Sequence, residues 1–375
     1  MQQEVDFLII GAGIAGASVA AELSRTHRTC VVERELRPGY HATGRSAALH
    51  TEIYGSAPIR ALTRASRNFF LEPEGGRAPF ATLRGCMFIA TAAQVADLDK
   101  FEALPDVAGA VTRLDAEAAR QLVPALRPGV IVGALKELNA YDLDVDAIHQ
   151  YFLRLLRSNG GGIACNAELV ALSRNGSAWE ATLADGQHIV AAIVINAAGA
   201  WGDAVATMAG VAPVGLQPLR RTAALIDPPS GLQTSRWPAV IDIGELFYFK
   251  PDAGRLLLSP ADETPSVPCD ALADEIDVAI AVERIQQVAD IEVTRAPQSW
   301  AGLRTFAPDR SPVVGFDPRS PGFFWLAGQG GYGIQTAPAL ARSAAALARG
   351  QPVPADIVDR GFDAALLAPG RFAAQ

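Results

Sequence analysis

The passage that most constrains the fold lies near the N-terminus, between residues 5 and 34. An apolar run from Val5 to Ile10 has the length of a buried strand, and the glycine-rich segment 11–16 (GAGIAG) follows it directly. An alanine-rich stretch through Leu23 then predicts a helix, and a second apolar run, 29–32, ends in Glu33. Strand, glycine turn, helix, strand and acid is the order of a dinucleotide-binding βαβ unit.

Each part of this unit has a physical task. Gly11 permits the tight turn, Gly13 lets the backbone approach a pyrophosphate, and Gly16 lets the helix lie close to the sheet. The helix N-terminus offers N–H donors and partial positive charge to phosphates, and Glu33 accepts hydrogen bonds from a ribose. The alternative is that the glycines only form a tight turn, and the motif alone does not choose between NAD and FAD.

Composition narrows the classes of partner and the number of domains. The chain has 375 residues, half of them hydrophobic, which predicts a globular protein of two domains. Its 32 basic and 40 acidic residues give a net charge of −8, without a basic block, so nucleic acid is not an expected partner. The N-terminus shows neither a leader nor a long apolar segment, which predicts a cytoplasmic protein without a membrane span.

The four cysteines are widely spaced, with no pair at the interval that zinc or redox sites favour. They are Cys30, Cys86, Cys165 and Cys269. The sequence therefore predicts reduced thiols and no metal site.

Three further segments carry a resemblance to a known family. Residues 38–48 (PGYHATGRSAA) follow the first βαβ unit, residues 192–201 form an apolar strand that ends in small residues, and residues 323–336 run from a strand into a glycine loop. In this order they resemble the D-amino-acid oxidase and glycine oxidase superfamily of FAD flavoproteins. In that family the segment at Gly44-Arg45-Ser46 begins a helix beside the flavin, and a long helix, expected here from Pro338, follows the glycine loop.

Within the superfamily the chain most resembles bacterial FAD-dependent D-arginine dehydrogenases, through residues 44–48, 247–254, 300–304 and 329–336. The resemblance implies an α/β fold with two domains. A Rossmann-like (GR2-type) FAD-binding domain takes residues 1–50, 140–212 and 300–375, and a substrate domain of mostly antiparallel β-sheet plus helices takes 51–139 and 213–299. Turn residues 251–254 predict a hairpin, and apolar spacing predicts helices over 115–121 and 271–288.

The resemblance also implies a set of contacts to noncovalently bound FAD. These contacts are Gly11, Gly13, Ile14, Ala15, Gly16, Glu33, Arg34, Thr43, Gly44, Arg45, Ser46, Ala48, Leu49, Leu169, Ala198, Gly199, Trp201, Gly330, Gly331, Tyr332, Gly333, Ile334 and Gln335. The absence of a cysteine beside Arg304, where sarcosine oxidases attach their flavin, argues against a covalent link.

Oxidation of an amino acid requires its Cα–H to face flavin N5, its amine to be unprotonated and its carboxylate to be held still. An arginine fork grips a carboxylate with two parallel bonds. By resemblance, Arg304 provides that grip and Arg221 is a second arginine of the pocket. The hydroxyls of Tyr54 and Tyr248 help to hold the substrate, and the Gly331 carbonyl receives the amine. The alternatives are structural ion pairs for the arginines and core packing for the tyrosines.

Two positions depart from the D-arginine pattern. Cys86 stands where enzymes for basic substrates carry an acid, and Leu49 stands where they carry histidine. The expected side-chain pocket consists of Leu49, His50, Thr51 and Cys86. Without a carboxylate to offset desolvation of a cationic side chain, we expect a preference for neutral, apolar D-amino acids.

These observations predict an FAD-dependent D-amino-acid dehydrogenase. Hydride passes from Cα to the flavin, the imino acid is hydrolysed to a 2-keto acid and ammonia, and O2 or a quinone-type acceptor reoxidises the flavin. The alternatives are a secondary-amine oxidase of the sarcosine or glycine type, a 2-hydroxy-acid dehydrogenase, and a non-catalytic flavin subunit of a larger assembly. The oligomeric state stays open, with a monomer among the alternatives.

Overall fold

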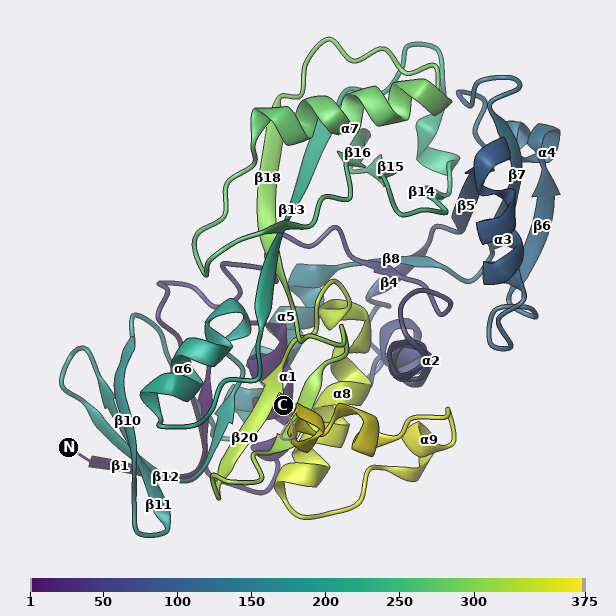
Figure 1. Cartoon of the computed structure of the whole chain (residues 1–375). Coiled ribbons are helices and arrows are strands. Elements are labelled where there is room, and N and C mark those ends of the chain that lie inside the picture. The colour runs from purple at the N-terminus through teal and green to yellow at the C-terminus, as the bar shows by residue number, and fades with distance from the viewer. Residues whose placement is uncertain (1, 373–375) are drawn as a thin grey trace.

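The computed structural model describes residues 2–372, which form a lower and an upper lobe in the view of Figure 1. The lower lobe contains the N-terminal strand β1 and the long helix α8, and the upper lobe is topped by helix α7. Two long strands, β13 and β18, run from the upper lobe down to the lower one.

An eight-stranded sheet forms the centre of the lower lobe. Its strands are β1 (Gln2–Ile10), β2 (Thr29–Val32), β9 (Gly162–Ala164), β10 (Leu169–Asn175), β11 (Ala178–Leu183), β12 (His188–Asn196), β19 (Val313–Phe316) and β20 (Phe323–Ala327). The order β9-β2-β1-β12-β20 is parallel throughout, while β10, β11 and β19 are antiparallel to their neighbours.

Both faces of this sheet are buried, which explains why its strands are nearly continuous apolar runs. Alternate side chains of β1 enter different cores, because successive residues of a strand point to opposite faces. Phe7 and Ile9 pack on the face covered by α1, α5 and α8, whereas Leu8 and Ile10 pack on the face covered by α6. The helices of this lobe are α1 (Ile14–Leu23), α2 (Ala57–Leu71), α5 (Val145–Ser158), α6 (Gly202–Met208), α8 (Gly333–Ala348) and α9 (Ala355–Val358).

A nine-stranded sheet forms the upper lobe. Its strands are β5 (Cys86–Thr91), β6 (Val111–Asp115), β7 (Ile131–Glu137), β13 (Gln217–Ile226), β14 (Ala239–Asp242), β15 (Tyr248–Asp252), β16 (Arg255–Ser259), β17 (Thr264–Pro265) and β18 (Gln298–Phe306). All neighbouring strands are antiparallel except β5 and β14. The fold class expected from the sequence, an α/β domain with a Rossmann-like sheet joined to a second, mostly antiparallel sheet with helices, is confirmed.

The remaining elements complete the upper lobe and join it to the lower one. Helices α3 (Val95–Glu102), α4 (Ala116–Leu122) and α7 (Glu275–Val288) cover the large antiparallel sheet. A small antiparallel sheet of β3 (Leu49–His50), β8 (Tyr141–Leu143) and β4 (Ala81–Leu83) lies between the lobes (Figure 1). The predicted residue boundaries between domains remain a prediction, because sheets mark layers and not independently folding units.

Most predicted local elements are present. Strands β15 and β16 form the expected hairpin, whose turn residues Ala253 and Gly254 both have positive φ. Helix α4 begins after Asp115, whose side chain caps it, and α7 begins at Glu275, later than predicted. Helix α8 also differs, since it begins at Gly333 and contains Pro338 in its interior.

One expectation is wrong. The segment at Gly44-Arg45-Ser46 does not begin a helix but continues a series of turns from residue 38. The Gly44 N–H donates to the Gly39 carbonyl in a turn, and the Arg45 side chain reaches the upper lobe, where it donates to the carbonyls of Ala271 (2.7 Å) and Ala301 (2.9 Å) and pairs with Asp270. Within residues 2–372 no helix is long and apolar enough to cross a membrane, and no cluster of metal-ligating side chains occurs.

Candidate functional site

A large cavity opens where the carboxyl ends of four parallel strands meet the lower part of β13 and β18. The strand ends contribute Gly11 after β1, Glu33 after β2, Ala197 after β12 and Gly328 after β20. Ligands of open α/β sheets bind in this crevice outside the carboxyl ends of the strands. The lining extends from these strand ends to Arg221 of β13 and Arg304 of β18, so the cavity can hold a ligand that reaches from one sheet to the other.

The glycine turn between β1 and α1 packs as the sequence predicts. Gly11 has φ +98°, and a Cβ added to it would lie 2.7 Å from the Ala197 carbonyl oxygen. A Cβ on Gly16 would lie only 1.9 Å from the Gly11 carbonyl oxygen. At Gly13 an added Cβ would meet only the Thr43 hydroxyl, at 3.3 Å. Two glycines thus permit backbone contacts, while Gly13 leaves a backbone surface open for a ligand to approach.

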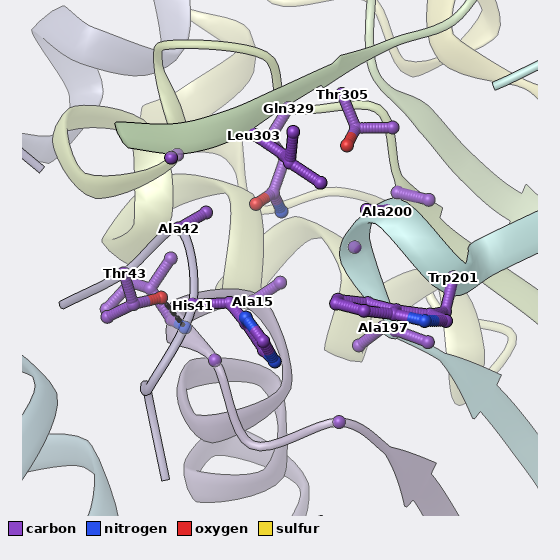
Figure 2. A pocket seen from close by; sticks show the side chains of 18 of the residues that line it. Ala15, His41, Ala42, Thr43, Ala197, Ala200, Trp201, Leu303, Thr305 and Gln329 are labelled. Atoms are coloured by element: carbon purple, nitrogen blue, oxygen red, sulfur yellow. Dashed lines mark hydrogen bonds between the residues drawn. The ribbon is translucent and has the colours of Figure 1, made fainter. Parts of the chain in front are cut away.

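Two helix N-termini converge on the cavity. Ile14, the first residue of α1, and Gly333, the first residue of α8, both line the cavity, and a Cβ on Gly333 would lie 3.5 Å from Ile14 Cγ2. The Thr43 hydroxyl accepts a hydrogen bond from the Ile14 backbone N–H at 2.9 Å, drawn as a dashed line in Figure 2. Helix N-termini carry partial positive charge, so this end of the cavity favours an anionic or electron-rich ligand.

Glu33 is held in place at the end of β2. It is 8% exposed, and its carboxylate accepts the Ala12 backbone N–H (2.8 Å) and the Glu35 backbone N–H (3.0 Å). Because no guanidinium or ammonium group is its partner among the described residues, these two donors fix the carboxylate on the cavity wall. That position suits the acceptor of a ribose hydroxyl.

Aromatic side chains form another part of the cavity wall. The Trp201 ring lies 4.7 Å from the His41 ring and 5.1 Å from the Arg34 guanidinium carbon. Ala15, Thr43 and His41 lie on one side of the cavity, and Ala197, Ala200 and Trp201 lie on the other (Figure 2). The small side chains leave room for a flat group beside the indole.

The two candidate carboxylate-binding arginines lie on adjacent strands. Arg221 of β13 is opposite Gly302 of β18, and Arg304 is opposite Leu219, so both arginines are on the same face in diagonal positions. The end of β18 also meets the glycine loop, since the Gly330 N–H donates to the Thr305 carbonyl at 2.9 Å. A Cβ on Gly331 would lie 2.7 Å from Arg304 Nη1. The glycine at 331 therefore lets the guanidinium lie against the loop.

The two arginines have different surroundings. Arg221 Nε donates to the Asp262 carbonyl at 2.7 Å, and its Nη2 lies 3.3 Å from Glu263 Oε1. No carboxylate pairs with Arg304 among residues 2–372. Arg304 is thus the guanidinium available to an incoming carboxylate, with Arg221 beside it.

Burial and charge act on these groups in different directions. Burial and the nearby Arg304 lower the pKa of Arg221. Burial alone would also lower the pKa of Arg304, but the neighbouring Tyr248 and Tyr54 raise it on balance, so this guanidinium stays charged. Burial raises the pKa of Tyr54, which therefore stays a neutral hydroxyl.

The two predicted tyrosines lie at different depths from the cavity. Tyr248 of β15 lines the cavity, whereas Tyr54 lies behind the wall, with its ring 5.2 Å from the ring of Tyr332. The Tyr54 hydroxyl donates to Glu245 Oε2 at 3.0 Å, and Glu245 has a positive φ of 56°.

Most predicted site residues line the cavity. They are Gly11, Gly13, Ile14, Ala15, Glu33, Arg34, Thr43, Arg45, Ser46, Leu169, Ala198, Gly199, Trp201, Arg221, Tyr248, Arg304, Gly330, Gly331, Gly333 and Ile334. Others do not line it, namely Gly16, Gly44, Ala48, Leu49, His50, Thr51, Tyr54, Cys86, Tyr332 and Gln335. Gly16 and Gly44 pack on backbone carbonyls behind the wall. The four residues expected to form the side-chain pocket thus lie outside this cavity, and Cys86 is 0% exposed.

Sequence reasoning missed several wall residues. His41, Leu303, Thr305 and Gln329 line the cavity, as Figure 2 shows. Leu303, Thr305 and Gln329 are each adjacent in sequence to a predicted residue, and His41 lies two residues before Thr43. The sequence therefore pointed to the correct segments but not to these residues. The partners Glu245 and Glu263 carry no motif, and only the fold brings them near the arginines.

Comparison with known proteins places the chain among flavoenzymes. A family model described as FAD dependent oxidoreductase (DAO) matches residues 6–347. The chain belongs to the DAO family of FAD-dependent oxidoreductases. FAD is therefore its cofactor.

Other DAO proteins are similar over most of this chain. The oxidoreductase YurR of Bacillus subtilis is 25% identical, covering 94% of this chain and 96% of YurR. The bifunctional tRNA-modifying protein MnmC of Burkholderia vietnamiensis is 27% identical over 82% of this chain, which spans only about half (48%) of MnmC. Glycine oxidase from Geobacillus kaustophilus has a solved structure that superposes with a TM-score of 0.83 at 21% identity, covering 98% of this chain and 99% of the oxidase.

A flavin-bound DAO structure shares the fold as well. L-α-glycerophosphate oxidase from Mycoplasma pneumoniae, with FAD bound, superposes with a TM-score of 0.84 at 19% identity, covering 92% of this chain and 95% of the oxidase. The residues of the present cavity fit this cofactor: the open backbone at Gly13 suits a pyrophosphate, Glu33 suits a ribose, and the α8 N-terminus suits the electron-rich end of the flavin.

Proposed function

We propose that this DAO enzyme oxidises the Cα–N bond of small amino acids, with D-amino acids of neutral or apolar side chain as its preferred substrates. The observation that carries the proposal is the pair of guanidinium groups, Arg221 and Arg304, on the cavity wall. The same cavity is lined by the glycine turn between β1 and α1 and by Glu33, which together we call the dinucleotide cradle. The chemistry that FAD supplies when bound is acceptance of a hydride. The protein has to bind, orient and deprotonate the substrate.

Orientation begins with the carboxylate. Arg304 has no acidic partner in the described part of the chain, so a substrate carboxylate gains a charge-assisted, two-pronged contact there. Arg221 is held by Asp262 and Glu263 and presents its remaining N–H groups nearby. Tyr248, on the same wall, adds a neutral hydroxyl donor.

The amine faces the glycine loop. The Gly331 backbone lies against the Arg304 guanidinium, and we assign its carbonyl as the acceptor of an amine hydrogen once the carboxylate is bound. A neutral amine is required before hydride leaves. Two neighbouring guanidinium groups favour the neutral amine over the ammonium form, because like charges repel in a poorly solvated site.

The preference for neutral side chains follows from the charges on the wall. The acids that line the cavity are Glu33 and Glu168, and both lie on the dinucleotide side, after β2 and before β10. A cationic side chain near Arg304 would meet two guanidiniums and no wall carboxylate.

A second candidate is oxidation of a small secondary amino acid such as sarcosine, or of glycine. The same carboxylate contact serves these substrates, and the similar proteins include a glycine oxidase and an iminodiacetate oxidase. D configuration in particular is carried by the resemblance to D-arginine dehydrogenases.

Anaerobic bleaching of the purified yellow protein tests the proposal. We expect D-methionine, D-leucine or D-phenylalanine to reduce the flavin faster than their L-enantiomers and faster than D-arginine, sarcosine, glycine and lactate. Faster reduction by D-arginine would contradict the side-chain preference. A flavin that no member of this panel bleaches would contradict the proposed reaction altogether.

A further inference from the structure

The proposed reaction leaves one buried carboxylate unused. Glu137, the last residue of β7, is 1% exposed and lies opposite Cys86 in the β5–β7 register. No lysine, arginine or histidine pairs with it among residues 2–372. Burying a carboxyl group without a cationic partner is costly, so the hydrogen bonds that Glu137 makes must offset much of that cost.

Both carboxylate oxygens of Glu137 bind one short segment. Oε2 accepts the Thr51 hydroxyl at 2.5 Å, and Oε1 accepts the Glu52 backbone N–H at 2.9 Å. The Gln335 side chain of α8 accepts the Thr51 backbone N–H at 3.3 Å. The start of this segment is therefore fastened to the upper sheet and to a helix whose first turn lines the flavin cavity.

The segment 51–55, which we call the Tyr54 strap, has no strand or helix of its own. At its far end the Arg60 guanidinium donates to the Gly55 carbonyl and pairs with Asp106. Gly55 has φ +91°, and a Cβ there would lie 3.0 Å from a ring carbon of Tyr332. Without ladder hydrogen bonds, the path of the strap depends on these side-chain contacts at its two ends.

Tyr54 lies between the two attachments. Its hydroxyl donates to Glu245, and its ring packs on Tyr332. Tyr332 follows Gly331, which lies against the Arg304 guanidinium, so Tyr54 is one residue removed from the carboxylate-binding group. A shift of the strap start by about 1 Å would move this hydroxyl out of hydrogen-bond range, since such bonds span roughly 2.5–3.2 Å.

We propose that Glu137 is a positioning residue, which holds Tyr54 beside the carboxylate-binding arginines by clamping Thr51 and Glu52. The inference rests on the proposed function for its effect on substrate, but the clamp itself is a property of the fold. Glu137 touches neither substrate nor cofactor and acts only through the strap.

The test compares holoenzymes of wild type, Glu137→Gln and Glu52→Gln. A glutamine at 137 offers one carbonyl oxygen and one NH2 group, so it accepts only one of the two donors. Glu52→Gln removes a neighbouring carboxylate, but keeps the backbone N–H that Glu137 binds, and serves as the matched control. We expect the limiting rate of flavin reduction to change less than the apparent Kd for the amino acid, which rises about tenfold in Glu137→Gln and less than twofold in the control.

Two further readouts separate positioning from general destabilisation. In a double-mutant cycle, Glu137→Gln should raise the Kd by less than about twofold when Tyr54→Phe is already present. Hydrogen exchange at the amides of residues 51–54 should be at least about tenfold faster in Glu137→Gln than in wild type or Glu52→Gln. If Glu137→Gln does not fold, Thr51→Val removes one of the two bonds and keeps the carboxylate.

The outcomes are distinguishable from failure of the proposed function. Unchanged exchange at 51–54 would refute the clamp, and independent effects of the two substitutions in the cycle would refute its action through Tyr54. If no amino acid bleaches the wild-type flavin, the proposed function fails, and the exchange measurement still decides whether Glu137 holds the strap.

Discussion

The cofactor side and the substrate side of the cavity are formed by different kinds of protein group. The cofactor side consists of backbone and small residues at the ends of β1, β2, β12 and β20, brought together by parallel strands. The substrate side consists of long polar side chains, Arg221, Tyr248 and Arg304, carried on antiparallel strands. The cofactor side depends on glycines, whose lack of a Cβ atom allows close backbone contacts. The substrate side depends on which polar and charged side chains are present. Substitutions on the two sides should therefore fail in different ways.

The largest effect is expected on the cofactor side. Gly16→Ala would place a Cβ 1.9 Å from the Gly11 carbonyl oxygen, so the helix and turn must separate. We expect a loss of at least about 3 kcal/mol of stability and a protein that is colourless as purified. Thermal unfolding and the visible flavin spectrum measure both. Gly109→Ala, where no atom lies within 4 Å of the added carbon, is the control, and a yellow Gly16→Ala protein of wild-type stability would refute the cradle geometry.

On the substrate side, the protein should stay yellow and lose activity. Arg304→Met removes the guanidinium group that has no acidic partner among residues 2–372. We expect kcat/KM to fall about 10²–10³-fold. Arg221→Met should cost less, about tenfold, because Arg221 is partly engaged by Asp262 and Glu263. Steady-state kinetics check both values.

Arg220→Met is the matched control for these variants. Arg220 is adjacent to Arg221 but projects from the opposite face of β13 and pairs with Asp277 at 2.7 Å. We expect its kcat/KM to stay within about threefold of wild type. If Arg220→Met were as impaired as Arg304→Met, the guanidinium contact to substrate would be the wrong explanation.

How much of this could be read from the sequence differs between the two sides. The cradle is predictable because Gly11, Gly13, Gly16 and Glu33 lie within one short segment with fixed local geometry. The arginines and tyrosines were placed by resemblance, and their mutual positions depend on strand register between β13 and β18. Partners such as Glu245 could not be predicted, because no local pattern shows which distant loop a side chain will meet.

The side-chain pocket illustrates the same limit. Leu49, His50, Thr51 and Cys86 were expected to surround the substrate, yet they lie outside the cavity, in and around the small sheet that contains β3 and in the adjacent core. Resemblance gives the neighbourhood of a residue, whereas the depth at which its side chain is buried follows from the packing of this particular chain.

Two buried titratable groups behind the substrate side, His50 and Glu137, should make the stability of the fold depend on pH. Burial lowers the pKa of His50 to about 4, so its neutral form stabilises the fold above pH 6.5, and this contribution is lost as the pH falls from about 6.5 to 4. Burial raises the pKa of Glu137 to about 7, so its contribution has the opposite sign and is lost as the pH rises from about 4.5 to 7. Each effect is on the order of 3 kcal/mol, and the two oppose one another.

When either residue is replaced, the dependence of stability on pH should show the contribution of the other residue. In His50→Gln, stability should increase as the pH falls from 7 to 5, and in Glu137→Gln it should decrease over the same range. Denaturant unfolding at several pH values measures these slopes. Parallel pH profiles for wild type and both variants would contradict the assigned titrations.

The smallest effect is expected at the rim. Glu263 binds both Arg221 (3.3 Å) and Arg310 (2.7 Å) and is partly exposed, so each contact is worth about 0.2–1 kcal/mol. Glu263→Gln should change KM by less than about fivefold and leave kcat nearly constant. The difference from wild type should shrink at high ionic strength, which salt-dependent kinetics would show; a large loss of kcat would place Glu263 in the reaction itself.

The long ribbon of β13 and β18 has a consequence for how the enzyme can move. Its ladder pairs Gln217 with Phe306 at the lower end and Leu225 with Gln298 at the upper end, so one continuous piece of sheet spans both lobes (Figure 1). A wide opening between the lobes would have to break or bend this pair of strands. We therefore expect substrate to enter and product to leave through movement of short peripheral segments, while the distance between Arg304 and the cradle stays constant through each turnover.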